Sequence, residues 1–188
     1  MDSTHLITPD INTNVKDEGR LGQFLAFTLQ QEMFCIDILH TREIIEFSQL
    51  TEIPMMPSYV RGVINLRGAV MPVLDLSVRL GRTHAEIGRR TCIVIVEVIY
   101  EGEVEALGLM VDAVNEVREI ARDNILPPPA FGSRIRTDFI AGMVRFHDRF
   151  VMILDVDHIF MSDEIADFIP SRLEREPSLA NLMQPQEA

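Results

Sequence analysis

The apolar residues of this chain fall into short runs that polar turns separate. Each run has the length of a β-strand, and the strongest, residues 91–98, consists almost entirely of branched side chains. Polar segments at Arg67-Gly68 and at residues 101–103 interrupt neighbouring runs in the manner of hairpin turns. The pattern predicts roughly ten short strands in an all-β fold, arranged as a sandwich or as barrels.

The expected strands pair mostly with their neighbours along the chain. They cover residues 24–29, 33–37, 60–66, 69–75, 91–98, 106–112, 139–146 and 150–156. Residues 38–45 form either one helical turn or a bent strand, and residues 114–120 form either a bent strand or a turn. Residues 50–57 are expected to be a loop or an edge segment and residues 125–132 an extended loop, because their prolines cannot donate to a strand ladder.

Aspartates follow two of the expected hairpins. Asp75 is placed to cap a short helix that ends near residues 80–81. Asp155 or Asp157 is placed to cap a terminal helix at about residues 158–168. A metal site at these two aspartates and His158 is the weaker interpretation, since alternation along a strand sends the histidine to the opposite face.

The hairpin at residues 60–76 recurs in weaker form at residues 140–156. Three of its residues meet identical residues 80 positions later; they are Gly62, Leu74 and Asp75, matched by Gly142, Leu154 and Asp155. Upstream, an offset of 73 aligns Glu43 with Glu116. Any two buried hairpins resemble each other, but the matching order on both sides favours a duplicated unit. The repeat predicts two similar subdomains, at approximately 21–85 and 86–160.

Composition narrows the possible functions. The chain has 188 residues and a net charge of −12, which repels phosphate backbones, so no nucleic-acid partner is expected. Residues 1–20 are expected to be a disordered N-terminal arm, and residues 161–188 a C-terminal helix or tail. Neither a secretory signal nor a membrane-length apolar run is found. We therefore expect a cytoplasmic protein without direct membrane insertion, and its two cysteines to be buried and inert.

No combination of residues points to a reaction. The five histidines show no metal-ligand spacing, and neither a glycine-rich phosphate loop nor a Gly-x-Ser-x-Gly motif occurs. The sequence thus predicts no catalytic residue, cofactor or metal, and indicates a binding protein. One polar pair lies in otherwise apolar surroundings, because Glu43 follows the first hairpin and Arg67 is at the tip of the second. From the residues alone, an ion pair and two separately solvated charges are equally compatible with this arrangement.

The segment from Gly62 to Leu76 resembles the signature of the CheW family of bacterial chemotaxis coupling proteins. The likeness runs from about residue 23 to residue 160 and includes residues 24–29, 36–38 and 42–44. It implies two intertwined five-stranded SH3-like β-barrels with short helices. It also implies a non-enzymatic adaptor that couples methyl-accepting chemoreceptors to the regulatory domain of the chemotaxis histidine kinase in membrane-associated signalling arrays.

The resemblance also implies two sets of binding residues. Those matching the family's receptor-side positions are Thr41, Glu43, Gly62, Arg67, Cys92, Gly108 and Val117. Those expected to contact the kinase are Leu50, Thr51, Ile53 and Phe131. The family places a salt bridge at Glu43 and Arg67, which favours the ion pair. Gly62 and Gly108 are expected to let a partner backbone approach closely, and Leu126 occupies a position where the family often has a basic residue.

Two alternatives to a chemotaxis coupling protein remain at this stage. One is the coupling protein of a related chemosensory pathway that controls pilus-driven or surface motility. The other is a small-molecule-binding barrel or an enzyme, which requires a pocket with convergent polar groups.

Overall fold

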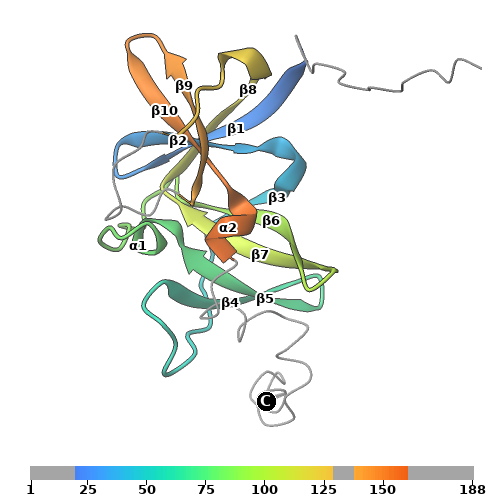
Figure 1. Ribbon diagram of the computed structural model, residues 1–188. Coiled ribbons are helices and arrows are strands. Elements are labelled where there is room, and N and C mark those ends of the chain that lie inside the picture. Colours follow the sequence, from blue (N-terminus) through green and yellow to red (C-terminus); the bar gives the residue numbers. More distant parts are fainter. Residues whose placement is uncertain (1–19, 129–137, 161–188) are drawn as a thin grey trace, which may run out of the picture.

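In the part of the chain that the structure describes, ten strands form two five-stranded sheets (Figure 1). The computed structural model describes residues 20–128 and 138–160. In spatial order, sheet A contains β8 (Ala113–Ala121), β1 (Leu21–Leu29), β2 (Glu32–Asp37), β10 (Arg149–Leu154) and β9 (Ile140–Phe146). Sheet B contains β3 (Thr41–Glu46), β6 (Cys92–Tyr100), β7 (Glu103–Val111), β5 (Ala69–Asp75) and β4 (Val60–Leu66). The predicted all-β fold is confirmed, and the two open interpretations of residues 38–45 and 114–120 resolve into strands β3 and β8.

Within residues 20–128 and 138–160, four short helical segments join or follow these strands. They are η1 (Ile38–His40), α1 (Leu76–Arg79), η2 (Arg122–Asn124) and α2 (Val156–Phe160). Asp75 caps α1 by accepting a hydrogen bond from the Val78 amide at 3.2 Å, and Asp155 accepts one from the His158 amide at 3.1 Å. Both predicted caps are therefore present. The segment 38–45 contains both of the expected structures, since the helical turn η1 at residues 38–40 is followed by strand β3.

The sheets do not divide the chain at residue 85. Sheet A joins β1 and β2 of the first half to β8, β9 and β10 of the second, whereas sheet B joins β3, β4 and β5 to β6 and β7. The predicted subdomains, at approximately 21–85 and 86–160 and intertwined, stay a prediction, and the sheets show that each half supplies strands to both sheets. The physical reason is the short η1 connection, after which β3 pairs with β6, so that Glu43 lies opposite Ile95. The halves exchange hairpins, which is consistent with the expected intertwining.

The duplicated unit is visible in the strand registers. In sheet B, Val73 of β5 pairs in parallel with Gly108 of β7. In sheet A, Ile153 of β10 pairs in parallel with Cys35 of β2. These two pairs are related by the offsets of 80 and 73 that the sequence predicts. An isolated β-bridge lies at an equivalent position in each sheet. Thr51 pairs with Val63 beside β4, and Leu126 pairs with Met143 beside β9.

The strands bury both of their faces. Alternate residues of β1 show this, because Leu25 and Phe27 enter a cluster shared by the two sheets while Phe24 and Ala26 enter a second cluster inside sheet A. A third cluster lies inside sheet B and contains Ile93 and other buried aliphatic side chains. Full burial of one such side chain contributes about 1.5–3 kcal/mol. The shared cluster therefore holds the two sheets together, since it takes side chains from both.

Some expectations lie wholly or partly outside the described residues. These are the N-terminal arm, the tail at 161–188, Phe131, and the expected terminal helix beyond residue 160. Within the described part, no helix is long and apolar enough to cross a membrane.

Candidate functional site

Arg67 and Glu43 form an ion pair at one end of sheet B. Two hydrogen bonds join them, from Arg67 Nη1 to Glu43 Oε1 at 3.1 Å and from Nη2 to Oε2 at 2.9 Å. Such a parallel, two-point contact fixes the orientation of both side chains. The backbone at Arg67 has φ of +53° and Gly68 has φ of +88°, so this predicted hairpin turn presents the guanidinium at its apex. The side chain of Arg67 is 71% exposed, which leaves it accessible to a partner.

Three of the predicted receptor-side residues share one row across sheet B. The register runs from Glu43 to Ile95, Gly108, Val73 and Gly62, which crosses all five strands. Arg67 reaches this row through its bonds to Glu43. The structure therefore aligns Glu43, Gly62 and Gly108 across sheet B, with Glu43 and Gly62 on its two edge strands, although they are far apart along the chain. The contact of Arg67 with Glu43, which the resemblance favours, is present.

The two glycines of this row are approached by the protein's own atoms. A Cβ on Gly62 would lie 2.4 Å from the carbonyl oxygen of Thr51, and the φ of +144° already favours glycine. A Cβ on Gly108 would lie 2.8 Å from Ile93 Cγ2 and 3.0 Å from Val73 Cγ2. Atoms of this protein therefore occupy the space that a side chain at either glycine would need, so any effect of the two glycines on a partner is indirect.

Gly62 links the two predicted sets of binding residues. Thr51 donates its amide to the Val63 carbonyl at 3.0 Å and accepts the Val63 amide at 2.9 Å. This bridge fits only because residue 62 lacks a side chain on that side. Leu50 and Ile53 flank the bridge and are half-buried, while Thr51 is exposed. The expected kinase-side segment is therefore held in place by an expected receptor-side glycine.

The remaining predicted receptor-side residues lie outside this row. Thr41 begins β3, and its Oγ1 is buried without a hydrogen-bond partner in the part of the chain that the structure describes. Cys92 begins β6 opposite Glu46, and its Sγ donates to the Arg90 carbonyl at 3.2 Å. Val117 lies on the edge strand β8 of sheet A and is 49% exposed. These three therefore do not join the row in sheet B.

Two residues that were not predicted as site residues, Ile44 and Gly142, are the repeat equivalents of predicted ones. Ile44 is 42% exposed on edge strand β3 and is the equivalent of Val117 at the 73-residue offset. Their cross-strand partners, Val94 and Leu25, both belong to the cluster shared by the sheets, so Ile44 and Val117 border that cluster on its two edges. Gly142 is the counterpart of Gly62, and a Cβ there would lie 3.0 Å from the Leu126 carbonyl oxygen. The repeat offsets were the signal that could have identified both.

A family model described as CheW-like domain matches residues 23–164. This match covers most of the chain and includes all the strands from β2 to β10. The chain belongs to the CheW-like family. Its relatives include the chemotaxis protein CheW of Rhizobium meliloti (strain 1021), which is 35% identical over 142 residues, covering 76% of this chain and 89% of the relative.

Further similarities support the same family. The chemotaxis protein CheW of Klebsiella aerogenes is 31% identical over 144 residues, which cover 77% of this chain and 84% of that protein. The crystal structure of the scaffolding protein TtCheW from Thermoanaerobacter tengcongensis superposes with a TM-score of 0.67 at 32% identity. That superposition covers 77% of this chain and 96% of the TtCheW chain. The two-sheet architecture described above is therefore the CheW fold.

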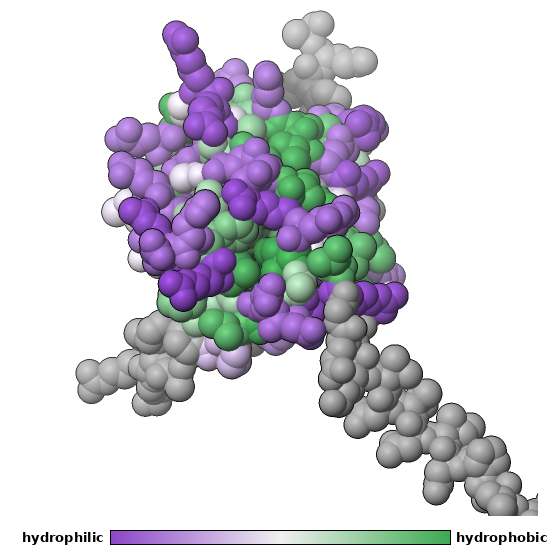
Figure 2. Space-filling model, turned by 90° about the horizontal axis from the view of Figure 1, so that it is seen from above, coloured by the Kyte–Doolittle hydropathy of each residue, from purple (hydrophilic) through white to green (hydrophobic). Residues whose placement is uncertain are grey.

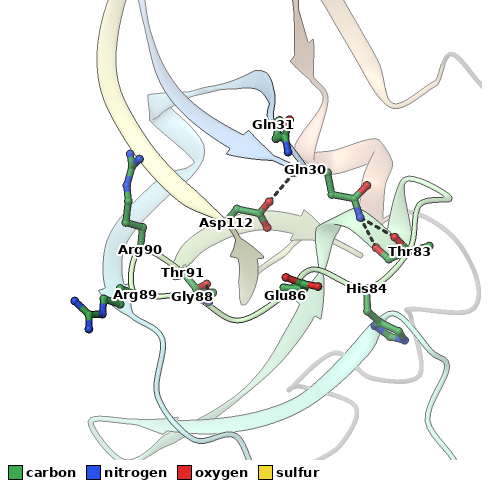
Figure 3. A pocket seen from close by; sticks show the side chains of 10 residues that line it. All are labelled: Gln30, Gln31, Thr83, His84, Glu86, Gly88, Arg89, Arg90, Thr91 and Asp112. Atoms are coloured by element: carbon green, nitrogen blue, oxygen red, sulfur yellow. Dashed lines mark hydrogen bonds between the residues drawn. The ribbon is translucent and has the colours of Figure 1, made fainter.

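A polar hollow of about 650 Å³ is lined by the β1–β2 turn, by part of the segment 83–91 and by Asp112 (Figure 3). None of its lining residues belongs to the row across sheet B. Its residues bond to one another. The backbone amide of Gln30 donates to Asp112 Oδ2 at 2.6 Å, and the side-chain Nε2 of Gln30 donates to the carbonyl and the hydroxyl of Thr83, both at 2.9 Å. Figure 3 shows Arg89 and Arg90 extending outward rather than toward Asp112. These bonds tie the β1–β2 turn to Asp112 between β7 and β8 and to Thr83 in the connection between α1 and β6, which is a structural role.

The two cysteines differ in their surroundings. Cys35 is fully buried in the sheet A cluster, and this desolvation raises the pKa of its thiol to about 11, although Arg118 acts in the opposite direction. A thiol with that pKa stays protonated and unreactive at neutral pH. Cys92 is half-buried, so the expectation of two buried cysteines holds for Cys35 only. In the described residues, no group of three or more His, Cys, Asp or Glu side chains is arranged to hold a metal ion.

Proposed function

We propose that this protein is a non-enzymatic adaptor that couples chemoreceptors to a chemotaxis histidine kinase. Membership of the CheW-like family supports this proposal, as do relatives named chemotaxis protein CheW. The single observation that carries it is the two-point pair of Arg67 with Glu43 at an exposed hairpin tip. A pair held in this way presents one fixed cation and a shaped surface without any reacting group, which suits recognition rather than catalysis.

On the receptor side, the proposed contact surface consists of Arg67, Glu43 and the apolar edge residues Val117 and Ile44. The partner is the cytoplasmic helical tip of a methyl-accepting chemoreceptor, which presents an apolar helix face. Recognition of such a face needs exposed apolar contacts with a polar group to set the orientation. Gly62, Gly108, Cys92 and Thr41 act from below the surface, by allowing the sheet to keep its shape. By this binding the protein is recruited to membrane-associated receptor arrays.

On the kinase side, the proposed contact is the segment with Leu50, Thr51 and Ile53. Thr51 is exposed and its backbone is fixed by the bridge to Val63, so the segment is ordered before binding and loses little conformational freedom. Phe131 remains proposed as the second contact to the regulatory domain of the kinase, on the strength of the family resemblance.

A pull-down of the full chain with a receptor cytoplasmic tip and the kinase regulatory domain tests the assignment. We expect Arg67→Glu to reduce receptor capture by about tenfold and to leave kinase capture unchanged. Arg145→Glu is the matched control, because Arg145 is 68% exposed in the equivalent hairpin and bonds Asp148. Equal capture of the receptor tip by the unmodified chain, Arg67→Glu and Arg145→Glu would contradict the receptor-side assignment. Ile53→Glu should give the reverse pattern, with kinase capture lost and receptor capture kept.

A further inference from the structure

The two sheets differ at their equivalent hairpin tips. In sheet B, the tip of β4–β5 is fastened to β3 by the bonds from Arg67 to Glu43. The residues 80 and 73 positions later are His147 and Glu116. Glu116 instead accepts a hydrogen bond from Arg118 Nε of its own strand at 2.7 Å. The duplicated fold therefore repeats the hairpin in sheet A without repeating the fastening pair.

A hollow of about 570 Å³ lies at this tip of sheet A. Its floor and walls include Met33 from β2 and Phe146, Phe150 and Met152 from the β9–β10 hairpin. Phe150 is 59% exposed, whereas its equivalent in sheet B, Val70, is half-buried. A cavity of this size accommodates large side chains of a ligand, and methionine and phenylalanine walls adapt to their shape. The tip of sheet A thus exposes apolar surface that the structure has not covered.

Basic side chains surround the apolar part of the hollow. Arg118 lies over the ring of Phe146, with its guanidinium carbon 4.1 Å from the ring centroid, and Arg149 and His147 line the same hollow. The one acidic lining residue, Glu32, is bonded to Arg82. Arg118 is paired with Glu116, so Arg149 is the lining arginine without an acidic partner among the described residues, on a chain whose net charge is −12. Figure 2, which views the molecule from above, shows green apolar patches bordered by purple polar side chains.

We propose that this hollow binds a partner protein through an acidic segment that carries an aromatic or branched apolar anchor. The anchor enters between Phe146, Phe150 and Met33, while a carboxylate beside the anchor pairs with Arg149. Arg118 lies over Phe146 and is bonded to Glu116, so it forms part of the wall against which the anchor packs. The hollow is lined by strands and turns of sheet A, whereas the Arg67–Glu43 pair of the proposed receptor contact belongs to sheet B, and Arg118 follows Val117 of that contact on β8.

Fluorescence anisotropy of the full chain with a labelled peptide tests this proposal. The probe is the peptide Gly-Asp-Glu-Phe-Ile-Asp-Glu-Gly, and its controls carry Lys at every acidic position or Ser in place of Phe. We expect saturable binding of the probe that weakens with salt, and about tenfold weaker binding of both controls. Phe150→Ser and Arg149→Glu should each weaken probe binding by about tenfold.

Two further variants complete the test. Ile99→Ser removes an apolar side chain that is 64% exposed on the β6–β7 hairpin of sheet B, and it should leave probe binding unchanged. Arg67→Glu should also leave it unchanged, which separates this surface from the receptor contact. The proposal is overturned if the Lys peptide binds as well as the probe, or if Phe150→Ser and Arg149→Glu bind like the unmodified chain. Far-ultraviolet circular dichroism of the variants verifies that each retains its fold.

Discussion

Arg67 at the tip of the β4–β5 hairpin donates two hydrogen bonds to Glu43 on edge strand β3. The two residues are 24 positions apart, and their bonds measure 3.1 Å and 2.9 Å. The Arg67 side chain is 71% exposed and that of Glu43 is 21% exposed. Water around the arginine screens the attraction, so the pair contributes orientation more than stability.

This exposure sets the expected cost of removing the pair. Arg67→Ala and Glu43→Ala should each lower the free energy of unfolding by about 1 kcal/mol or less. A double-mutant cycle measured by urea unfolding should give a coupling energy of about 0.5 kcal/mol. A coupling energy above about 3 kcal/mol would mean that the pair holds the fold together, as a buried pair does.

Gly62 is buried and should tolerate substitution poorly. Gly62→Ala places a Cβ 2.4 Å from the Thr51 carbonyl oxygen at a φ of +144°, so the Thr51–Val63 bridge must shift. We expect a loss of about 2–4 kcal/mol in the free energy of unfolding, together with weaker kinase capture. Gly88→Ala is the matched control, since a Cβ there meets nothing within 4 Å, and should change stability by less than about 0.5 kcal/mol. Equal stability of the two variants would contradict this account of Gly62.

Asp75 and Asp155 occupy equivalent cap positions but differ in burial. Asp75 is fully buried and accepts hydrogen bonds from Val78 N at 3.2 Å and Ala85 N at 3.3 Å, and its Oδ2 lies 3.2 Å from His84 Nδ1. Asp75→Ala leaves buried donors unpaired, so we expect a loss of about 3 kcal/mol. Asp155→Ala, at a side chain that is 29% exposed, should cost about 1 kcal/mol, typical of a lost cap. Urea unfolding of both variants compares them, and a smaller loss at Asp75 would refute the argument from burial.

Cys35 should make stability depend on alkaline pH. Burial raises its pKa from 9.0 to about 11, so the unfolded chain loses this proton at a lower pH than the folded chain does. The contribution is fully present below the unfolded pKa and decreases as pH rises toward the folded one. Between about pH 8 and about pH 10, the unmodified chain should lose about 1 kcal/mol more stability than Cys35→Ala does. Parallel pH profiles of the two proteins would contradict the raised pKa.

The local pattern of the sequence was sufficient for most of the hairpins. The turn at Arg67-Gly68 and the caps at Asp75 and Asp155 depend on residues close in sequence, and all three are present. The repeat was also detectable, because identical offsets reappear in the parallel pairs of the two sheets. The features that depend on the alternation of apolar residues and on turn residues, namely the hairpins and their caps, were therefore predictable from the sequence.

The exchange of hairpins between the sheets was not predictable in this way. Two repeated units give the same local pattern whether each closes on itself or pairs with the other. The choice depends on long-range pairings, such as Glu43 with Ile95, that leave no local signal. For the same reason the residues alone left the Glu43–Arg67 pair open, and the contact of Gly62 with Thr51 was missed.

The most direct test of the coupling function is kinase autophosphorylation in a reconstituted mixture of receptor, kinase and this protein. We expect the full chain to make autophosphorylation respond to receptor ligand. Arg67→Glu should abolish the response while basal kinase activity is kept, and the Glu43→Arg, Arg67→Glu double variant should restore part of it by re-forming the pair. Arg145→Glu should behave like the unmodified chain. A kinase that remains unresponsive to receptor ligand in the presence of the unmodified chain would contradict the coupling function.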